Sequence, residues 1–357
     1  MGDQGGLTLP TRDNYINKTA QHEKILNAYL DYMTKIGVLL GASNENDTRR
    51  QMKEVIEFET RLAQITVPNE DRRDEESLYN LMSLTELQDL APFIDWRSHF
   101  EDAFRLINRK ISEKEKVVVY APTYLKNLTL LINNYTRTED GKMYNLRKAL
   151  IGSDGGEEPW RYCVQDTSNG FAIGAMFVRE VFHGESKPQA EEMINEIRTA
   201  FKENLRKLSW MDKETKAMAE EKADSISDMI GFPDYILDPT QLDEKYKDLE
   251  IDGNQYFDNN LKLNAYNLKK NLERLDQPVN KTRWSMSPPT VNAYYTPTKN
   301  QVVFPAGILQ FPFFDFANPK SLNYGAIGVV VGHEITHAFD DQGREYDKYG
   351  VVLVNNR

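Results

Sequence analysis

The chain has 357 residues, of which 40% are hydrophobic and 28% are charged. These fractions are those of a soluble globular protein and argue against intrinsic disorder and fibrous structure, and the length suggests two or three compact units. Forty-four basic residues against 55 acidic ones leave a formal net charge of -11, which repels a polyanion at long range. We therefore expect no nucleic-acid partner.

Neither a membrane anchor nor a secretion signal is recognisable in the sequence. The longest apolar stretch, at 326–331, is far shorter than the roughly 18 residues of a spanning helix. The opening MGDQGGLTLPTRD lacks the basic start and apolar core of a signal peptide. Taken literally, the polypeptide would remain in the cytosol. Cys163 is the only cysteine, so an internal disulfide is excluded and any metal has to be held by histidines and carboxylates.

Apolar residues at helical spacing dominate the first 285 residues. Two such faces, from Ile25 to Leu40 and from Val55 to Ile65, predict amphipathic helices. Asp212 is the expected N-cap of a later helix. The Gly-rich, charged text between Tyr135 and Trp160 is typical of a loop or linker. Further helices are predicted over 124–133, 171–182, 190–208, 212–230 and 257–275, and a short strand over 117–120.

The pattern changes after Trp284. The segments VNAYY at 291–295 and QVVF at 301–304 are rich in β-forming residues and are separated by TPTKN, which predicts a β-hairpin. Residues 322–340 then follow an almost wholly apolar helical pattern, which predicts one helix buried on most sides. We place a domain boundary near residue 285, so that a helical N-terminal lobe spans 1–285 and a second domain spans 286–357.

The 322–340 helix carries the strongest chemical signal, which is His333, Glu334 and His337 in the HExxH spacing. Side chains four residues apart on a helix share one face, so both imidazoles can reach one metal ion while Glu334 lies beside it. Zinc with a bound water is the centre that this arrangement favours. In the alternative interpretation the two histidines belong to the core and pair with the backbone and Glu334, which would bury much polarity without a metal.

Two histidines do not complete a catalytic zinc site, which needs a third protein ligand. Asp and Gly at positions 340 and 343 exclude a third-histidine motif, and Glu345 is the only glutamate after His337. Glu345 lies in a turn-rich stretch, and we do not expect it to be the ligand. Asp340 and Asp341 share the helix face of His337, and they either orient its ring through the second nitrogen or form an acidic pair that is solvated or paired with Arg344.

The predicted hairpin also has two interpretations. An edge strand beside a metal-binding helix can pair with an extended peptide, and Asn292 would add a side-chain amide with a donor and an acceptor. An ordinary structural hairpin is the simpler interpretation.

Three segments of the second domain resemble a known family, the neprilysin and endothelin-converting-enzyme family of zinc metallopeptidases, and the endothelin-converting branch more closely. The segments are WSMSPP at 284–289, VNAYYTPTKNQVVFPAGILQ at 291–310 and SLNYGAIGVVVGHEITHAFDDQGREYDK at 321–348. Upstream segments such as WMDKETKAMAEEKAD at 210–224 match in the same order, so the resemblance covers nearly the whole chain.

The resemblance implies a mainly α fold, in which a large helical lobe is followed by the start of a thermolysin-like α/β catalytic lobe. In such a zinc metalloendopeptidase His333 and His337 would bind Zn²⁺ and Glu334 would be the general base for a zinc-bound water. Asn292 and Ala293 would hydrogen-bond the backbone of small peptide substrates, which would be cleaved on the amino side of large apolar residues.

The resemblance also implies an enzyme at the extracellular face of the plasma membrane. Such a location suits the five Asn-x-Ser/Thr sequons of the chain. These lie at Asn17, Asn46, Asn127, Asn134 and Asn280.

Some parts of the family pattern have no counterpart in this sequence. These are the membrane anchor and the third ligand, a glutamate in a downstream NExxAD-like motif. We therefore expect a chain that is truncated at both ends and inactive by itself, with apolar residues such as Ile327, Val330 and Val331 left exposed. The alternative function is that of a catalytically silent helical protein that binds peptides or other partners.

Overall fold

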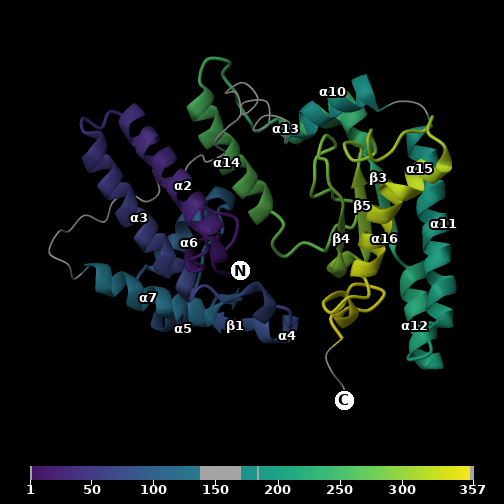
Figure 1. Ribbon diagram of the computed structural model, residues 1–357, viewed down its shortest axis with the longest axis horizontal. Helices are drawn as coiled ribbons and strands as arrows, with labels where there is room; N and C mark the ends of the chain where they lie inside the picture. Colours follow the sequence, from purple (N-terminus) through teal and green to yellow (C-terminus); the bar gives the residue numbers. More distant parts are fainter. Residues whose placement is uncertain (1, 137–169, 183–184, 354–357) are drawn as a thin grey trace. The chain divides into compact units, whose positions relative to one another are not determined.

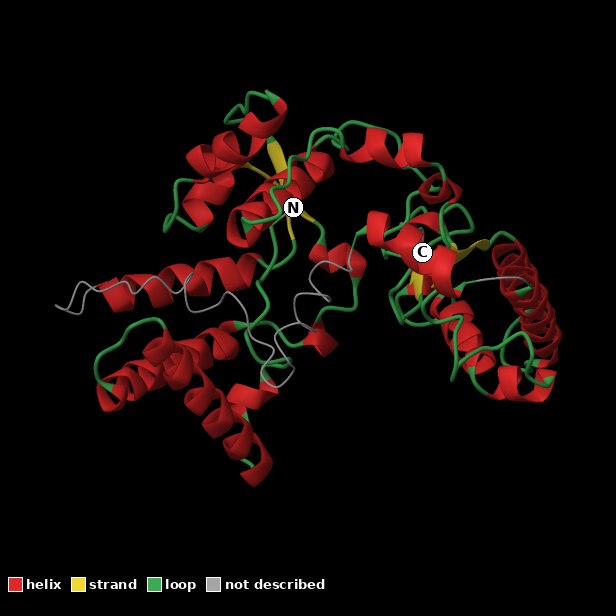
Figure 2. Ribbon diagram, turned by 90° about the horizontal axis from the view of Figure 1, so that it is seen from above, coloured by secondary structure: helices red, strands yellow, loops and turns green. Residues whose placement is uncertain are grey.

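The computed structural model describes residues 2–136, 170–182 and 185–353. The chain divides into two compact units, residues 1–157 and 158–357, and helices dominate both of them, as the sequence predicts (Figure 2). Most of the predicted linker at 135–160, like Cys163, falls outside the described residues. None of the described helices is both long and apolar enough to cross a bilayer.

The first unit is a set of helices around one short two-stranded sheet. Its two longest helices, α2 (Ala20–Leu39) and α3 (Glu45–Ile65), pack against each other. Tyr29 of the face predicted for α2 is buried, but Ile36 and Leu40 at the end of that face are exposed. β1 (Asn80–Ser83) and β2 (Lys116–Val119) pair antiparallel, which confirms the strand predicted over 117–120. The other helices are α1 (Asp13–Ile16), η1 (Asn69–Asp71), α4 (Glu75–Leu78), α5 (Leu84–Leu90), α6 (Trp96–Phe104), η2 (Arg105–Ile107) and α7 (Pro122–Thr136).

The second unit contains a three-stranded mixed sheet with the order β3-β5-β4. β3 (Ser227–Gly231) runs parallel to β5 (Gln301–Pro305), and β4 (Tyr294–Thr296) runs antiparallel to it. β4 and β5 are the predicted hairpin, with the first strand starting at Tyr294 rather than at 291. β4 is therefore an edge strand, and Figure 1 shows α16 beside the sheet.

Ten helices of the second unit lie among the described residues. Asp212 caps α12 as predicted, because its carboxylate accepts a hydrogen bond from the Thr215 N–H at 2.8 Å. The helices are α10 (Phe171–Val181), α11 (Ser186–Lys207), α12 (Lys213–Asp224), η3 (Asp234–Leu237), α13 (Pro239–Tyr246), α14 (Tyr256–Leu272), η4 (Pro297–Lys299), α15 (Lys320–Gly325), α16 (Ile327–His337) and η5 (Gly343–Glu345).

The core of the second unit lies between α11, α16 and the sheet. Phe304 of β5 and Ile327 of α16 are fully buried, and Val331 is 1% exposed. Our expectation that Ile327 and Val331 stay exposed is therefore wrong, because α11 packs against α16 and covers them. Val330 is partly buried against the same core, and the apolar residue that α16 does leave exposed is Val329.

The helix predicted over 212–230 is shorter in the structure. It ends at Asp224, and the segment after it forms β3, whose first residue Ser227 donates its N–H to the Asn300 carbonyl at 3.0 Å. Ile226 and Ile230 are four residues apart, a spacing that places two side chains on one face of a helix and also on one face of a strand. Pairing with β5, a contact between distant parts of the chain, outweighs this local helical spacing.

The apolar helix predicted over 322–340 is two helices. The chain leaves the helical conformation at Ala326, with φ -108° and ψ -88°. The Ile327 N–H donates to the Phe313 carbonyl at 3.0 Å instead of to a carbonyl of the preceding turn. α16 ends at His337, and Val329 is 66% exposed, so the prediction of burial on most sides is wrong for its outer face.

The compact units divide near residue 157, whereas our sequence-based boundary lies near 285. Helices α10 to α12 and strand β3 precede residue 285, yet they share a sheet and a core with β5 and α16. The helix with the HExxH motif is thus supported by residues from both sides of the predicted boundary.

Candidate metal centre

The side chains of His333 and His337 converge at the C-terminal end of α16. Their Nε2 atoms are 2.9 Å apart, and their rings meet edge to face with centroids 4.4 Å apart. Their spacing of four residues places both rings on one helix face. The two Nε2 atoms therefore lie at one location beside the helix.

This convergence fits a zinc ion. Two nitrogens bound at about 2.05 Å in tetrahedral geometry lie about 3.3 Å apart, which exceeds the observed separation of 2.9 Å by a few tenths of an ångström. A small opening of the ring pair would admit the ion. Neutral imidazole nitrogens are ligands that zinc prefers, so His333 and His337 could hold Zn²⁺.

Asp340 lies against the second nitrogen of His337. Its Oδ2 is 2.7 Å from His337 Nδ1, while its Oδ1 accepts the N–H groups of Gln342 and Gly343 at 3.0 and 2.7 Å. Partial burial alone would raise the pKa of Asp340, but these hydrogen bonds lower it. An ionised carboxylate only accepts, so Nδ1 carries the proton and Nε2 keeps its lone pair for a metal.

Glu334 is a buried carboxylate beside the two imidazoles. It is 6% exposed, and burial raises the pKa of its carboxyl above the ordinary value, against the opposing effect of His337, His333 and the backbone of Tyr295. A carboxylate in this environment accepts a proton at a pH closer to neutrality than an exposed glutamate does.

A cavity of about 370 Å³ joins these groups to the edge strand. The strand segment that borders it starts with Asn292, whose side-chain oxygen accepts the Ala293 N–H at 2.9 Å, just before β4 begins. The cavity is lined on this side by Asn292, Ala293, Tyr294, Tyr295 and Pro297, and on the helix side by His333, Glu334, His337, Asp340, Gln342 and Gly343.

Two other acids considered from the sequence stand outside this group. Asp341 is exposed and does not border the cavity, and Glu345 lies in η5. In the described part of the chain no three His, Cys, Asp or Glu side chains come close enough to hold a metal together. The two imidazoles are therefore the ligands that the described residues offer.

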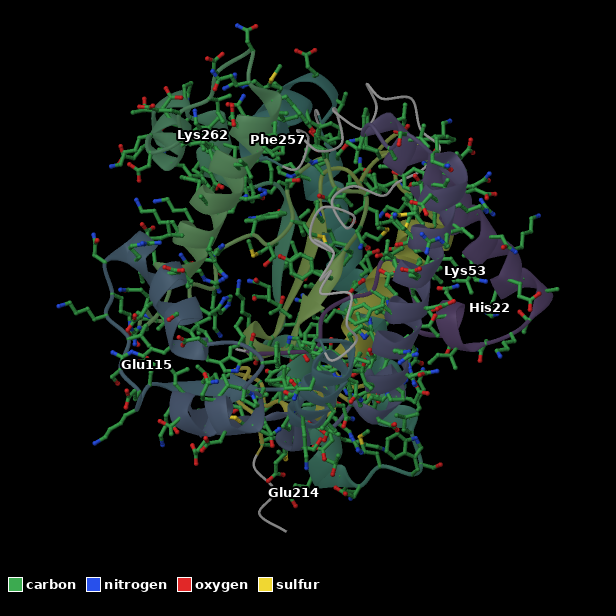
Figure 3. The ribbon with its side chains drawn as sticks, turned by 90° about the vertical axis from the view of Figure 1, so that its left-hand side faces the viewer. His22, Lys53, Glu115, Glu214, Phe257 and Lys262 are labelled. Atoms are coloured by element: carbon green, nitrogen blue, oxygen red, sulfur yellow. The ribbon has the colours of Figure 1, made fainter. Side chains whose placement is uncertain are left out.

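Two further histidines lie in the first unit and take structural roles. His22, labelled in Figure 3, follows the N-cap of α2, and its Nδ1 is 2.7 Å from Thr19 Oγ1. The ring of His99 packs edge to face against Trp96 and Phe100. His183 falls outside the described residues.

Sequence reasoning missed the residues that reach the site through distant contacts. Tyr295 and Gln342 line the cavity, and Lys222 of α12 donates to the Gly343 carbonyl. Tyr295 and Gln342 could have been found from the sequence, since both lie within two residues of predicted site residues. No local pattern connects Lys222 with a turn 121 residues further along the chain.

The sequence matches two profiles of peptidase family M13, one over residues 1–146 and 142–233 and the other over 292–355. It is 65% identical to an endothelin-converting enzyme homolog of Locusta migratoria over 98% of this chain and 51% of that protein. Neprilysin-3 of Drosophila melanogaster is 61% identical, with 98% and 48% covered. The chain thus spans about half the length of the curated relatives it matches.

A solved structure has the same fold. The zinc metalloprotease Zmp1 of Mycobacterium tuberculosis, determined with an inhibitor, superposes with a TM-score of 0.76 at 28% identity, covering 98% of this chain and 55% of that one. The names of these relatives are those of the family that the motifs resemble, and the predicted mainly α fold is confirmed. On these matches, which include the HExxH segment, the chain belongs to peptidase family M13, a family of zinc metalloendopeptidases.

Proposed function

We propose that the whole protein is a zinc-dependent metalloendopeptidase that cleaves small peptides on the amino side of large apolar residues. The observation that carries this proposal is the pair of convergent imidazole nitrogens of His333 and His337, next to the buried carboxylate of Glu334, in one cavity. The resemblance to peptidases supports the substrate class and the site of cleavage.

Each group of the site has a role in this proposal. His333 and His337 hold Zn²⁺ together with a third protein ligand that the described residues do not supply. When bound, the ion acts as a Lewis acid towards a water molecule and the peptide carbonyl. Glu334 takes a proton from the attacking water and passes it to the nitrogen of the leaving amine, a role for which the raised pKa of its carboxyl is suited. Asp340 keeps the proton of His337 on Nδ1.

The edge strand supplies the binding surface in this proposal. Among the described residues β4 pairs with β5 along one edge, so an extended peptide can pair with its other edge by main-chain hydrogen bonds. The Asn292 side-chain oxygen is engaged by the Ala293 N–H, which leaves its amide group to donate to the peptide. Asn292 and Ala293 thereby fix the register of the substrate next to Glu334.

Zinc binding and peptide hydrolysis test the proposal in turn. We expect the whole protein to bind one Zn²⁺ in calorimetric titration, and we expect His333→Ala and His337→Ala to abolish the binding. His22→Ala removes a histidine of the first unit and should leave the binding unchanged. The whole protein, produced at the length of its relatives, should cleave a peptide library before large apolar residues and stop when the metal is chelated. Zinc retained by both site variants would contradict the proposal.

The second candidate function is a catalytically silent helical protein that binds peptides. The observation that favours it is that the described residues offer two metal ligands instead of three. The same consideration leads us to propose that the 357-residue chain by itself is not a competent peptidase. Chelator-sensitive hydrolysis by this chain would exclude both statements.

We also propose that the whole protein works at the extracellular face of the plasma membrane. Its support is the resemblance and the exposure of four of the five sequon asparagines, Asn17, Asn46, Asn134 and Asn280, with Asn127 half-buried. After secretion from eukaryotic cells, treatment with a peptide N-glycosidase should lower the mass of the protein. A secreted protein without N-glycans would count against this location.

A further inference from the structure

Lys222, in the last turn of α12, is a buried lysine with two hydrogen bonds to a distant segment. It is 7% exposed, and its Nζ donates to the carbonyls of Gly343 and Tyr346, each at 2.6 Å. The ammonium also lies 5.7 Å from the centre of the Phe339 ring. Burying a charge costs free energy unless the charge is paired or hydrogen-bonded. The folded chain therefore has to keep these carbonyls next to the ammonium. We call residues 339–346 the post-helix turn, because they follow α16 directly.

The post-helix turn connects Lys222 to the candidate metal ligand His337 by hydrogen bonds. The carbonyl of Gly343 accepts the hydrogen bond from Lys222, while its N–H donates to Asp340 Oδ1 at 2.7 Å. The other oxygen of Asp340 contacts His337 Nδ1 at 2.7 Å. A continuous series of hydrogen bonds therefore runs from Lys222 through Gly343 and Asp340 to the imidazole.

The turn has little freedom to move at this point. A Cβ at Gly343 would lie 1.8 Å from the His337 carbonyl oxygen, so the backbone of Gly343 is packed directly against the end of α16. Because the two segments are in contact, a displacement of Gly343 changes the place of the Asp340 carboxylate relative to the His337 ring.

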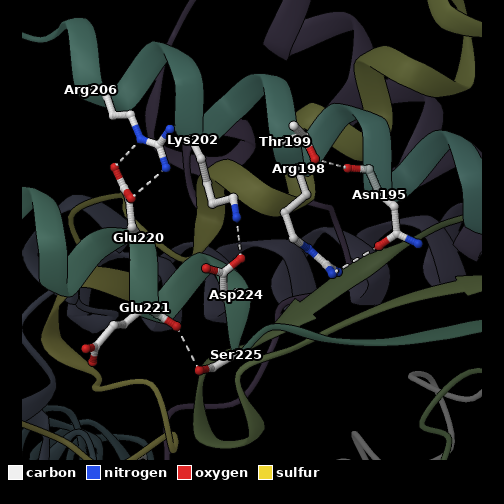
Figure 4. A network of polar contacts seen from close by, with 9 residues as sticks. All are labelled: Asn195, Arg198, Thr199, Lys202, Arg206, Glu220, Glu221, Asp224 and Ser225. Carbon is white, nitrogen blue, oxygen red and sulfur yellow. Dashed lines mark hydrogen bonds and ion pairs between the residues drawn. The ribbon is translucent and has the colours of Figure 1, made fainter.

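The helix that carries Lys222 is itself firmly attached. Figure 4 shows its polar contacts with α11, in which Arg206 binds Glu220 through two hydrogen bonds of 2.8 and 3.0 Å, and Lys202 pairs with Asp224. Such bidentate pairs restrict geometry more than single ion pairs do. Lys222 thus projects from a fixed support.

A second contact joins the same helix end to the opposite wall of the cavity. The Lys222 carbonyl accepts a hydrogen bond from Asn300 Nδ2 at 3.2 Å. Asn300 is fully buried, and its Oδ1 accepts the hydroxyl of Tyr295, which lines the cavity beside Glu334, at 2.9 Å. The end of α12 therefore contacts the supports of both the helix side and the strand side of the site.

We infer that Lys222 is a positioning residue for the metal centre, which holds the post-helix turn so that Asp340 keeps His337 in its ligating orientation. This inference rests on the proposed function, in which His333 and His337 bind Zn²⁺. Partners that orient a metal-binding imidazole in this way typically contribute 10- to 100-fold to metal affinity.

The first test compares zinc affinities at pH 7 for two variants of α12. Lys222→Met keeps the length of the side chain but removes the charge and the donors, and we expect it to weaken zinc binding about 10- to 100-fold. Glu221→Gln is the matched control, because the exposed carboxylate of Glu221, on the same helix, pairs at 2.8 Å with Lys348, two residues beyond the post-helix turn. It should change the affinity less than about twofold.

A double-mutant cycle then asks whether Lys222 acts through Asp340. If it does, adding Lys222→Met to Asp340→Asn should weaken zinc binding little beyond Asp340→Asn alone. Two effects that multiply independently would overturn the inference, since a general loss of stability does not depend on the Asp340 carboxylate.

The ring of His337 in the metal-free chain gives a readout that needs no zinc. Nitrogen-15 spectra of the wild-type chain should show His337 with its proton on Nδ1, and Lys222→Met should mix the two tautomers while the signals of His22 and His99 stay unchanged. Lys222→Arg, which keeps a charge and donors, should fall between wild type and Lys222→Met, and it serves as the test variant if the methionine variant does not fold.

The two possible failures are distinguishable. If the whole protein binds no zinc, the proposed function fails, while the His337 signal of the metal-free chain still tests the role of Lys222. If the wild type binds zinc and the variants at Lys222 keep both its affinity and its His337 signal, the role of Lys222 is refuted and the proposed function stands.

Discussion

Two buried glutamates, one in each compact unit, stand in very different surroundings. Glu59 of α3 is 2% exposed, and its carboxylate accepts hydrogen bonds from Thr8 Oγ1 at 2.5 Å and from the Tyr15 hydroxyl at 3.1 Å. Glu334 of α16 is 6% exposed and borders a cavity with two imidazoles. The first carboxylate is saturated by fixed donors of the protein, whereas the second faces space in which a ligand can lie.

The surroundings of Glu59 show what a structural buried charge requires. Tyr29 and Tyr15 both lie near it, and burial, assisted by the negative charge of Glu59, raises the pKa of Tyr29 to about 12. These hydroxyls therefore stay protonated and keep donating hydrogen bonds. Burial alone thus does not identify a catalytic carboxylate. The useful criterion is burial together with an open cavity and further chemical groups that point into it.

Substitution of Glu334 should have the largest effect of this comparison, and the quantity that it changes should be the rate of turnover. In the whole protein, Glu334→Gln keeps the size of the side chain but removes its basicity, so we expect turnover to fall by a factor of about 10² to 10⁴. Zinc content should stay at the wild-type level. The measurements are steady-state hydrolysis of a peptide and metal analysis of the same preparation. Turnover close to wild type would assign the base to another residue.

The corresponding change at Glu59 should affect stability and leave the site intact. Glu59→Gln replaces an acceptor by an amide that faces two hydroxyl donors, which should lower the free energy of unfolding by about 1 to 3 kcal/mol. Urea denaturation measures this change, and zinc titration should give the wild-type affinity. Glu57→Gln, on an exposed position of the same helix, is the control and should change stability by less than about 0.5 kcal/mol. Equal effects of the two substitutions would mean that the hydroxyl donors contribute nothing.

The parts of the candidate site that sequence could predict are those fixed by helix geometry. His333, Glu334 and His337 are neighbours on one helix face, and Asp340 follows one turn later, so their proximity depends on local conformation only. The helices α2, α3 and α11 were predictable for the same reason, since their apolar residues recur at helical spacing along the sequence.

The parts that sequence could not predict depend on contacts between distant segments. The end of the apolar helix at Ala326 follows from a hydrogen bond between Ile327 and the Phe313 carbonyl, which is formed only after the chain has folded back. The strand at Ser227–Gly231 exists because β5 is available to pair with it. The hydrogen bond of Lys222 to the Gly343 carbonyl also joins distant segments, and no sequence pattern around either residue predicts it.

Lys222 extends the comparison to a buried cation. Burial lowers the pKa of Lys222 from its ordinary value of 10.5 to about 8, although Asp347 and Asp340 act in the opposite direction. Between about pH 8 and 10.5 the unfolded chain therefore keeps a proton that the folded chain has released. Because the unfolded state binds more protons in this window, the free energy of unfolding should rise with pH there. At lower pH, where Lys222 is protonated in both states, it should add no pH dependence.

The effect can be isolated by subtracting a protein that lacks the group. We expect the free energy of unfolding of the wild type, minus that of Lys222→Met, to be constant up to about pH 7 and to increase steadily from pH 8 to pH 10. Urea denaturation at intervals of one pH unit measures it, and the buried tyrosines, present in both proteins, cancel in the difference. A difference that does not change with pH would show that Lys222 keeps its ordinary pKa. It would also show that the carbonyls of Gly343 and Tyr346 offset the cost of burying the charge, as the hydroxyls around Glu59 do for an anion.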